Sequence, residues 1–489
     1  MSSDNSNLIV AALQKTDPDL AKKIDADNSW KATITRKGAR VALYREYEIG
    51  DHRADITDQM RKMLRLPTGD DELTEFNDNY MEVVIDKEAS RLFVSSITGE
   101  DADQEWIEDT LERNRFVSEQ GQWYRGAIRD GDAYVMVDLN ANWVSVPAYD
   151  GFSGLVVVHS GNTGKAEWAC KLWSETSSED DENTNVQMNV VVYQAGGITF
   201  YTGEEGSSAL TEVENKPYLA ENLPIVSFVN KKDTHTDSGR SELRPAIPLQ
   251  DVLNRELHSL VMASELAAFG IKWSKGMEID LDGIVPGGII NLVIKDAGGN
   301  VMNELTDKQI EFLGNVEVGQ FEATDITQYL EVIDKIVQQI GQVTQTPIRG
   351  VTSSGQISGA ALKQLEIGLL GKVQRFQWQN TSAFGDLLEL TAEIQNAYNT
   401  GEGSAPDIGA IKVVWKDAEI LDVNERIAAL KDLRKDSPGL FTDDFYIEQV
   451  GSLLNLSQAD INKQKEETAK QQGSFFDALT GGDGTVPAV

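Results

Sequence analysis

The sequence has few of the residues on which catalytic and metal sites usually depend. It contains one cysteine, Cys170, and four histidines in 489 residues. An internal disulfide is therefore excluded, and no two histidines have the HExxH spacing of a zinc-binding helix. Cys170 lies in an apolar run after Trp168 and Ala169, which predicts a small core residue and fits a reducing compartment. We expect no metal site and no catalytic residue.

Motifs that would indicate an enzyme are incomplete. Gly161-Asn-Thr-Gly164-Lys165 lacks the glycine spacing and the hydroxyl residue of a phosphate-binding P-loop, because Ala166 follows the lysine. The other Gly-Lys pair, Gly371-Lys372, falls inside a predicted helix. We therefore predict that the protein is not an enzyme and uses no cofactor.

Basic residues are in deficit. The chain has 79 acidic and 44 basic residues, a formal net charge of -35. A protein that grips nucleic acid neutralises phosphates with clustered Lys and Arg, so this balance argues against tight binding, although not against a protein that lets nucleic acid pass. An acidic surface that keeps the protein dispersed is the commoner explanation for such a charge. No apolar run approaches the 18 residues of a membrane span, so we expect no membrane insertion.

The stretch from Asp325 to Asn399 is predicted to form a helix, a polar loop and a longer helix. Apolar residues recur every three or four positions from Ile326 to Ile340 and again from Leu362 to Leu387, the spacing of amphipathic helices. A proline and glycines between them favour a loop. Ser358 is a suitable N-cap for the longer helix. Such a pair could present its loop to a passing molecule or simply be a helical hairpin in a core.

The N-terminal quarter is predicted to be mainly helical. Residues 1–28 are polar and acidic, so we expect a loosely held arm there. Helical spacing follows from Trp30 to Glu48, from Met81 to Val94 and from Glu105 to Gly121.

Short β-rich runs separated by Gly, Asn and Asp begin near Gly131 and predict an antiparallel meander. The runs are Ala133–Leu139, Trp143–Val146, Gly154–Val158, Glu167–Trp173, Val186–Tyr193 and Ile198–Tyr201. A further strand is predicted at Ile411–Trp415, and we expect it to rejoin this meander.

A helix is predicted from Asp251 to Phe269, with Pro248 before it and Gly270 as a stop. The glycine-rich segment Ile271–Phe321 separates this helix from the one that begins at Asp325. It predicts a small β-containing excursion between two helices that run side by side. Further helices are expected at Val423–Lys435, Asp443–Leu454 and Ser457–Lys470.

Several short segments recur in a fixed order along the chain: Tyr44–His52, Asn79–Val84 with Asp86 and Leu92, Gly131–Val135, Pro224–Asn230, Gly239–Leu243, Pro248–Asn254 and Gly355–Lys363. Taken in order, they resemble the portal (head-to-tail connector) proteins of tailed double-stranded DNA bacteriophages. The strongest likeness is in Pro224–Asn230, Gly239–Leu243 and Pro248–Asn254, which lead into a helix as in that family.

The resemblance implies an α+β ring subunit with a helical stem, a β-containing clip, an α/β wing and a helical crown. The implied boundaries are an N-terminal arm at 1–28, a wing at 29–250, stem helices at 251–270 and 323–343, a clip at 271–322, a tunnel loop at 344–357, a long wing helix with a returning strand at 358–420, crown helices at 421–471 and a disordered tail at 472–489.

The resemblance also implies a function. The protein would form a homo-oligomeric ring, a dodecamer, at the capsid vertex of a virion assembled in the host cytoplasm. Double-stranded DNA would pass through its channel during packaging and ejection. Its partners would be the terminase large subunit, a neck or adaptor protein, and the major capsid and scaffolding proteins. The alternatives are a ring or stalk without DNA transit and, in another class, a nuclease or motor subunit.

Candidate site residues follow from these assignments. The DNA-facing tunnel loop would comprise Thr346, Pro347, Ile348, Arg349, Gly350, Val351, Thr352, Ser353, Ser354 and Gly355, and its junction with the long helix would comprise Ser358, Gly359 and Lys363. Arg349 is the only charged residue in the loop, so we expect it to contact phosphates transiently. The candidate acidic channel lining is Glu256, Glu265, Glu331 and Asp334, because an acidic surface does not hold DNA phosphates.

Overall fold

The structure, a computed structural model, describes residues 5–16, 29–52, 77–100, 103–159, 166–176, 186–205, 209–232, 238–268, 272–275, 306–315, 317–320, 325–348, 359–400, 404–419, 427, 430–433, 435, 443–453, 463 and 465. The chain divides into two units, Met1–Lys416 and Asp417–Val489. The predicted tunnel loop from Arg349 to Ile357 and the predicted disordered tail lie outside the described residues.

The first unit contains a five-stranded antiparallel sheet of strands that follow one another along the chain. It comprises β4 (Gly154–His159), β5 (Ala166–Thr176), β6 (Val186–Gln194), β7 (Gly197–Glu204) and β8 (Leu210–Pro217). The predicted meander is confirmed for the first four of these strands. β8 was not predicted because most of its side chains are polar and exposed.

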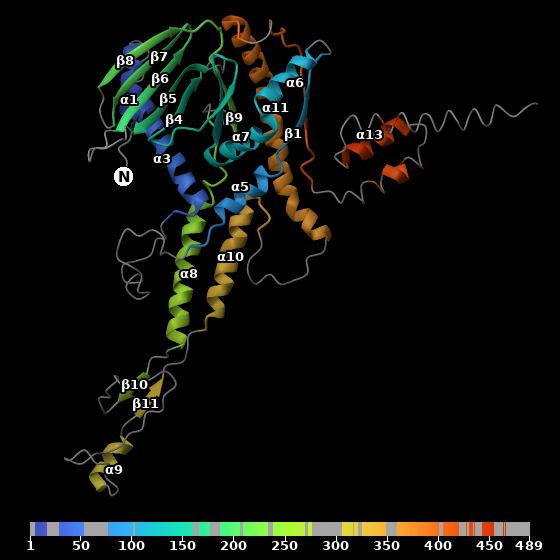
Figure 1. The fold of residues 1–489 in the computed structure, drawn as a ribbon. Helices are drawn as coiled ribbons and strands as arrows, with labels where there is room; N and C mark the ends of the chain where they lie inside the picture. The colour runs from blue at the N-terminus through green and yellow to red at the C-terminus, as the bar shows by residue number, and fades with distance from the viewer. Residues whose placement is uncertain are drawn as a thin grey trace, which may run out of the picture. The chain divides into compact units, whose positions relative to one another are not determined.

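The expectation of a loosely held N-terminal arm is wrong for α1 (Ser6–Thr16). Its side chains Leu8, Ile9 and Leu13 are fully buried and share a hydrophobic core with the five-stranded sheet, including Trp168 and Cys170 (Figure 1). The apolar residues of α1 are spaced by four and five positions, as on one helical face. Burial against the sheet outweighs the polar character of the flanking sequence.

A second sheet has three strands in the order β3-β2-β9. Its strands are β2 (Asp132–Val137), β3 (Trp143–Val146) and β9 (Ile225–Val229). The prediction that β2 and β3 begin the same meander as the later strands is therefore wrong. β2 pairs with β9, so that Asp132 lies opposite Val229. Nothing local in the sequence indicates a pairing between strands so far apart along the chain.

The N-terminal helices are α3 (Ser29–Ile49), α5 (Met81–Ala89), α6 (Gln104–Arg113) and α7 (Phe116–Asp130). Two of the predicted helices, Met81–Val94 and Glu105–Gly121, have the wrong bounds. The first ends at Ala89, and Val94 begins a strand, β1 (Val94–Thr98). The second is two helices, because Arg115 adopts a left-handed backbone with φ 50° and so interrupts the helical hydrogen bonds.

Strand β12 (Lys412–Trp415) pairs antiparallel with β1, so that Val413 lies opposite Ile97. It does not rejoin the meander, and that prediction is corrected. The core beside it is aromatic: the Trp415 ring lies 5.5 Å from Tyr124 and 5.7 Å from Phe384. These ring contacts hold β12 against α7 and the long helix, away from the five-stranded sheet.

The helix predicted at Asp251–Phe269 is confirmed as α8 (Ile247–Ala268). The two helices predicted on either side of the polar loop are confirmed as α10 (Thr327–Thr344) and α11 (Gly359–Tyr398). Between α8 and α10, the described residues form α9 (Asp307–Gly314) and two strands, β10 (Lys272–Lys275) and β11 (Glu317–Gln320), that pair with each other. A β-containing excursion was predicted here.

The second unit contains α13 (Asp443–Leu453), which confirms the helix predicted at 443–454. Residues 430–433, within another predicted helix, are also helical. Among the described helices, none has both the length and the apolar character needed to cross a bilayer.

Candidate functional site

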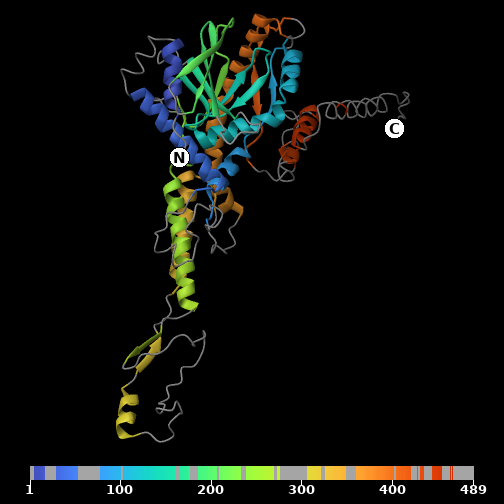
Figure 2. The same ribbon diagram turned by 60° about the vertical axis from the view of Figure 1, so that its left-hand side comes forward.

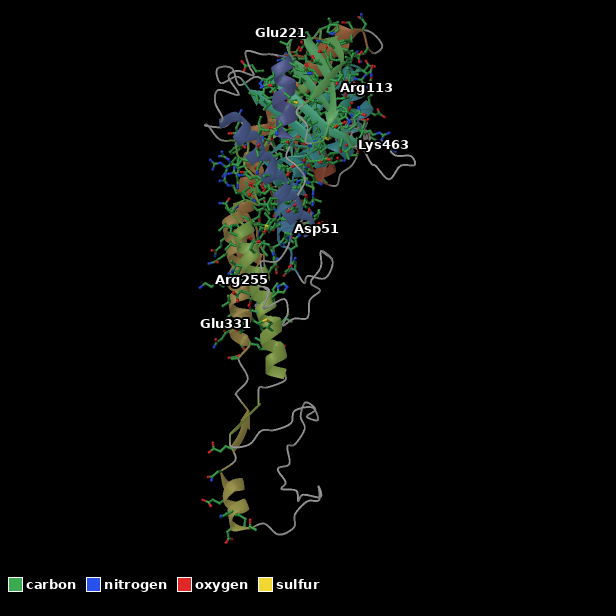
Figure 3. All side chains as sticks on the ribbon, turned by 90° about the vertical axis from the view of Figure 1, so that its left-hand side faces the viewer. Asp51, Arg113, Glu221, Arg255, Glu331 and Lys463 are labelled. Carbon is green, nitrogen blue, oxygen red and sulfur yellow. The ribbon has the colours of Figure 1, made fainter. Side chains whose placement is uncertain are left out.

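Two helices of the first unit, α8 and α10, run side by side (Figures 1 and 2). On α10 the buried apolar side chains are Ile333, Ile336, Val337 and Ile340. They recur at intervals of three, one and three residues and therefore share one face of the helix. The opposite face is exposed and includes Glu331 (Figure 3). The pair is thus held by apolar packing and leaves a polar surface outside.

The four predicted channel carboxylates differ in how exposed their side chains are. Glu331 is exposed and Glu256 is half-buried, whereas Asp334 is only 7% exposed. Burial and nearby carboxylates, Asp334 among them, raise the pKa of Tyr80. Asp334 is covered by its own subunit and therefore does not fit a channel lining. The side chain of Glu265 lies outside the described residues.

The first turns of α8 are fastened to the segment that precedes α5. Gln250 accepts a hydrogen bond from the Tyr80 backbone N–H (3.1 Å) and donates one to the Asp78 carbonyl (2.6 Å). Asn254 accepts one from the Asp78 N–H (3.0 Å). Both amide side chains are fully buried, so these bonds form where water does not compete. They fix where α8 leaves the body of the unit.

His52, which follows α3, makes a further contact with the start of α8. Its ring stacks on Tyr47 with 4.1 Å between centroids, and Tyr47 donates a hydrogen bond to Asp251. The Asn254 amide nitrogen lies 3.0 Å from His52 Nε2. Because the amide oxygen of Asn254 already accepts from Asp78, its nitrogen donates and Nε2 must accept, which requires a neutral His52. Burial lowers the pKa of His52 in agreement.

The first residues of the predicted tunnel loop fold back on the end of α10. Gln345 has a left-handed backbone with φ 52°, and the Thr346 N–H then donates to the Gly341 carbonyl at 2.9 Å. Thr346 is 3% exposed, while Pro347 and Ile348 are half-buried. Thr346 is therefore part of a turn that ends α10.

The start of α11 lies against the same turn. Gly359 begins the helix as predicted, and Ser358 and the side chain of Lys363 are outside the described residues. A Cβ at Gly368 would lie 3.2 Å from the Gln345 Cβ, whereas a Cβ at Gly371 would meet nothing within 4 Å. Gly368 thus allows α11 to approach the end of α10 closely.

A buried ion cluster anchors the middle of α11. The Lys372 ammonium nitrogen lies 2.7 Å from Glu88 Oε2 on α5 and 3.0 Å from Glu242 Oε2. Glu242 is also paired with Lys231 at 2.7 Å and accepts a hydrogen bond from Asn230. The side chains of Lys372, Glu88 and Glu242 are at most 1% exposed. The two lysines balance the two carboxylates in charge, as burial requires.

The cluster shifts the pKa values of its members in opposite directions. Burial, and then the Glu242 carboxylate, raises the pKa of Glu88 to about 7. Burial acts in the same direction on Glu242, but Lys372 and Lys231 outweigh it and hold the pKa of Glu242 below its ordinary value. The two carboxylates outweigh burial at Lys372 and raise its pKa.

The prediction from sequence missed both the ion cluster and the buried hydrogen bonds that Gln250, Asn254 and His52 form at the start of α8. One signal existed for the cluster: Lys372 lies between the apolar positions Leu369 and Val373, on the face of α11 that must be buried. A lysine on such a face requires a carboxylate partner. The partners could not be identified, because Glu88 and Glu242 are far from Lys372 in the sequence.

An α+β body that carries two paired helices and a 40-residue helix is the organisation expected of a portal subunit. The chain belongs to the family of SPP1 Gp6-like phage portal proteins, whose family model matches residues 74–474. The family is structural and not catalytic. Among the described residues, no group of three or more His, Cys, Asp or Glu side chains could hold a metal ion.

Two solved structures are similar to the chain, each at 12% sequence identity. The first is the neck of an empty gene transfer agent (GTA) particle with C6 symmetry, with a TM-score of 0.39 over 82% of this chain and 94% of that chain. The second is the virion of a native GTA particle, with a TM-score of 0.36 over 85% of this chain and 99% of that chain. No curated protein matches the sequence.

Two glycines of α11 make a matched pair for a stability test. We expect Gly371→Ala to raise the free energy of unfolding by about 0.5–1 kcal/mol, because alanine favours the helix and has open space there. Gly368→Ala should gain less or lose stability, because its Cβ presses on Gln345. Urea unfolding followed by circular dichroism measures both. Equal gains at the two positions would contradict the close approach.

The raised pKa of Glu88 predicts a pH dependence. Between pH 4.5 and 7 the folded protein retains a proton on Glu88 that the unfolded chain has released. The free energy of unfolding therefore falls as pH rises through this window, by up to about 1 kcal/mol per pH unit from this group. Glu88→Gln should remove that part of the slope, as measured by urea unfolding at pH 5, 6, 7 and 8.

The exposed Glu389→Gln is the control for Glu88→Gln, since it removes an equal charge without disturbing the cluster. Because the pKa of Glu242 is lowered, this group changes the free energy of unfolding only below pH 4.5, and there the free energy rises with pH. An unchanged slope in Glu88→Gln relative to the wild type would exclude titration of Glu88 in this range.

Proposed function

We propose that copies of this chain form a ring at the portal vertex of a capsid, and that double-stranded DNA enters and leaves through its channel. The observation that carries the proposal is the family match over residues 74–474. The ring is a dodecamer in the virion and assembles in the host cytoplasm. It docks the terminase large subunit during packaging and a neck or adaptor protein afterwards, and it contacts the major capsid and scaffolding proteins.

The paired helices α8 and α10 form the stem of the proposed channel, and their carboxylates face the DNA. Glu331 and Glu256 support this role because they are exposed and half-buried, respectively, in the single chain. Negative side chains do not displace counterions from phosphates and so create no sticking points along the path. Arg349 and the loop that contains it contact the duplex transiently at the constriction, next to the turn at Thr346.

The oligomeric state of the purified protein tests the proposed ring directly. We expect native mass spectrometry to detect a closed oligomer and negative-stain images to show rings with an axial opening of at least about 20 Å, the width that a B-form duplex requires. A stalk, or a ring sealed at its axis in every state, would favour the alternative of an assembly protein without DNA transit.

Charge reversal on the stem tests the channel lining. In Glu256→Lys/Glu331→Lys, each lysine adds a phosphate contact, so we expect slower DNA packaging at low salt and recovery as salt rises. The control Glu256→Gln/Glu331→Gln removes the same carboxylates without adding a cation and should package nearly normally. Packaged DNA per capsid measures both. Normal packaging by the lysine variant at low salt would place these residues away from DNA.

A further inference from the structure

Helix α3 has a basic outer face in an otherwise acidic chain. It contains five basic and two acidic residues. Arg36, Arg40 and Leu43 are exposed at positions i, i+4 and i+7, which places them on one helical face. No ion pair joins Arg36 or Arg40 to another described residue, whereas Lys37 is paired with the buried Asp132 at 2.5 Å. Among the described residues, the two outward-facing arginines therefore form no ion pair.

Helix α6 has the complementary outer face. It contains four acidic residues and one basic residue. Glu105, Glu108, Asp109 and Glu112 are all exposed, and they occupy positions i, i+3, i+4 and i+7 on one side of the helix. The opposite side is anchored by the buried Ile107. Within the described part of the chain, these four carboxylates form no ion pair.

The two faces cannot meet within one subunit. α3 and α6 each pack against α7, and both views show them on opposite sides of that helix (Figures 1 and 2). Arg113, at the end of α6, is labelled in Figure 3. Arg36 and Arg40 lie four residues apart, as do Glu108 and Glu112, so each pair spans about 6 Å of helix at 1.5 Å per residue. They are therefore alike in length, opposite in charge and separated by the body of the unit.

We infer that α3 of one copy docks on α6 of the next copy, with Arg36 and Arg40 facing Glu108 and Glu112. Two different, complementary faces on one chain make a head-to-tail contact, which closes into a ring when the rotation between copies permits. The contact rests on the proposed ring and identifies where its subunits meet. Arginine suits this role because its planar guanidinium can bind a carboxylate through two hydrogen bonds.

A charge exchange tests the contact in the full-length protein. Arg36→Glu/Arg40→Glu and Glu108→Arg/Glu112→Arg each place like charges opposite one another. We expect each to raise the protein concentration needed for half-maximal assembly by at least about tenfold. In a ring where the two reversal variants alternate, every contact pairs opposite charges, and the four substitutions combined in one chain restore opposite charges at every contact as well. Assembly should then return to within about threefold of wild type.

The control is Lys87→Glu/Lys412→Glu, which makes the same change in charge at exposed lysines of α5 and β12 and should assemble as wild type. Light scattering across a concentration series measures assembly, and circular dichroism verifies that each variant is folded.

Three results would overturn the inference. If the reversal variants assemble as wild type does, the ring stands but its contact lies elsewhere. If they fail and the four-fold combination does not restore assembly, α3 and α6 do not face each other. If the arginine variant assembles normally but retains DNA less well, α3 contacts nucleic acid. Absence of any oligomer from the wild type would instead overturn the proposed function itself.

Discussion

The position of α11 depends on one buried cation. Lys372 lies in the middle of a helix whose neighbouring residues pack in a core, and a charge in such a place must be paired. Its two partners come from α5 and from the segment before α8, so the pairing brings three distant parts of the chain together. Lys231 then balances the second carboxylate. The rest of the first unit is arranged around this requirement.

A second joint lies where α8 leaves the body. Gln250, Asn254 and the neutral His52 connect α3, the segment before α5 and the start of α8 through buried hydrogen bonds. At this same end of the helix pair, the end of α10 is tied to α11 by the turn at Thr346 and the close approach at Gly368. Both paired helices are therefore connected to the rest of the unit where α8 begins and α10 ends. A displacement of α8 and α10 would therefore also move α11, the helix that follows the proposed tunnel loop.

Much of the secondary structure was predictable because it depends on local periodicity. α8, α10 and α11 have apolar residues at helical spacing, and β4 to β7 have β-forming runs between turns. The errors occurred where a distant segment decides the outcome. α1 is held by burial against a sheet, β12 pairs with β1, and β9 separates β2 and β3 from the meander. A short segment contains no information about the surface that covers it.

By itself, the sequence determined the class of the protein, since the ordered short motifs, the missing catalytic residues and the excess of acid pointed to a portal subunit, and it determined which segments are long helices. Only the tertiary structure decided which charges are buried and which are exposed. It placed Asp334 inside the subunit, gave Lys372 its two carboxylates and left Arg36 and Arg40 exposed. Burial and ion pairing depend on the spacing of atoms in the fold, and the order of residues along the chain does not specify that spacing.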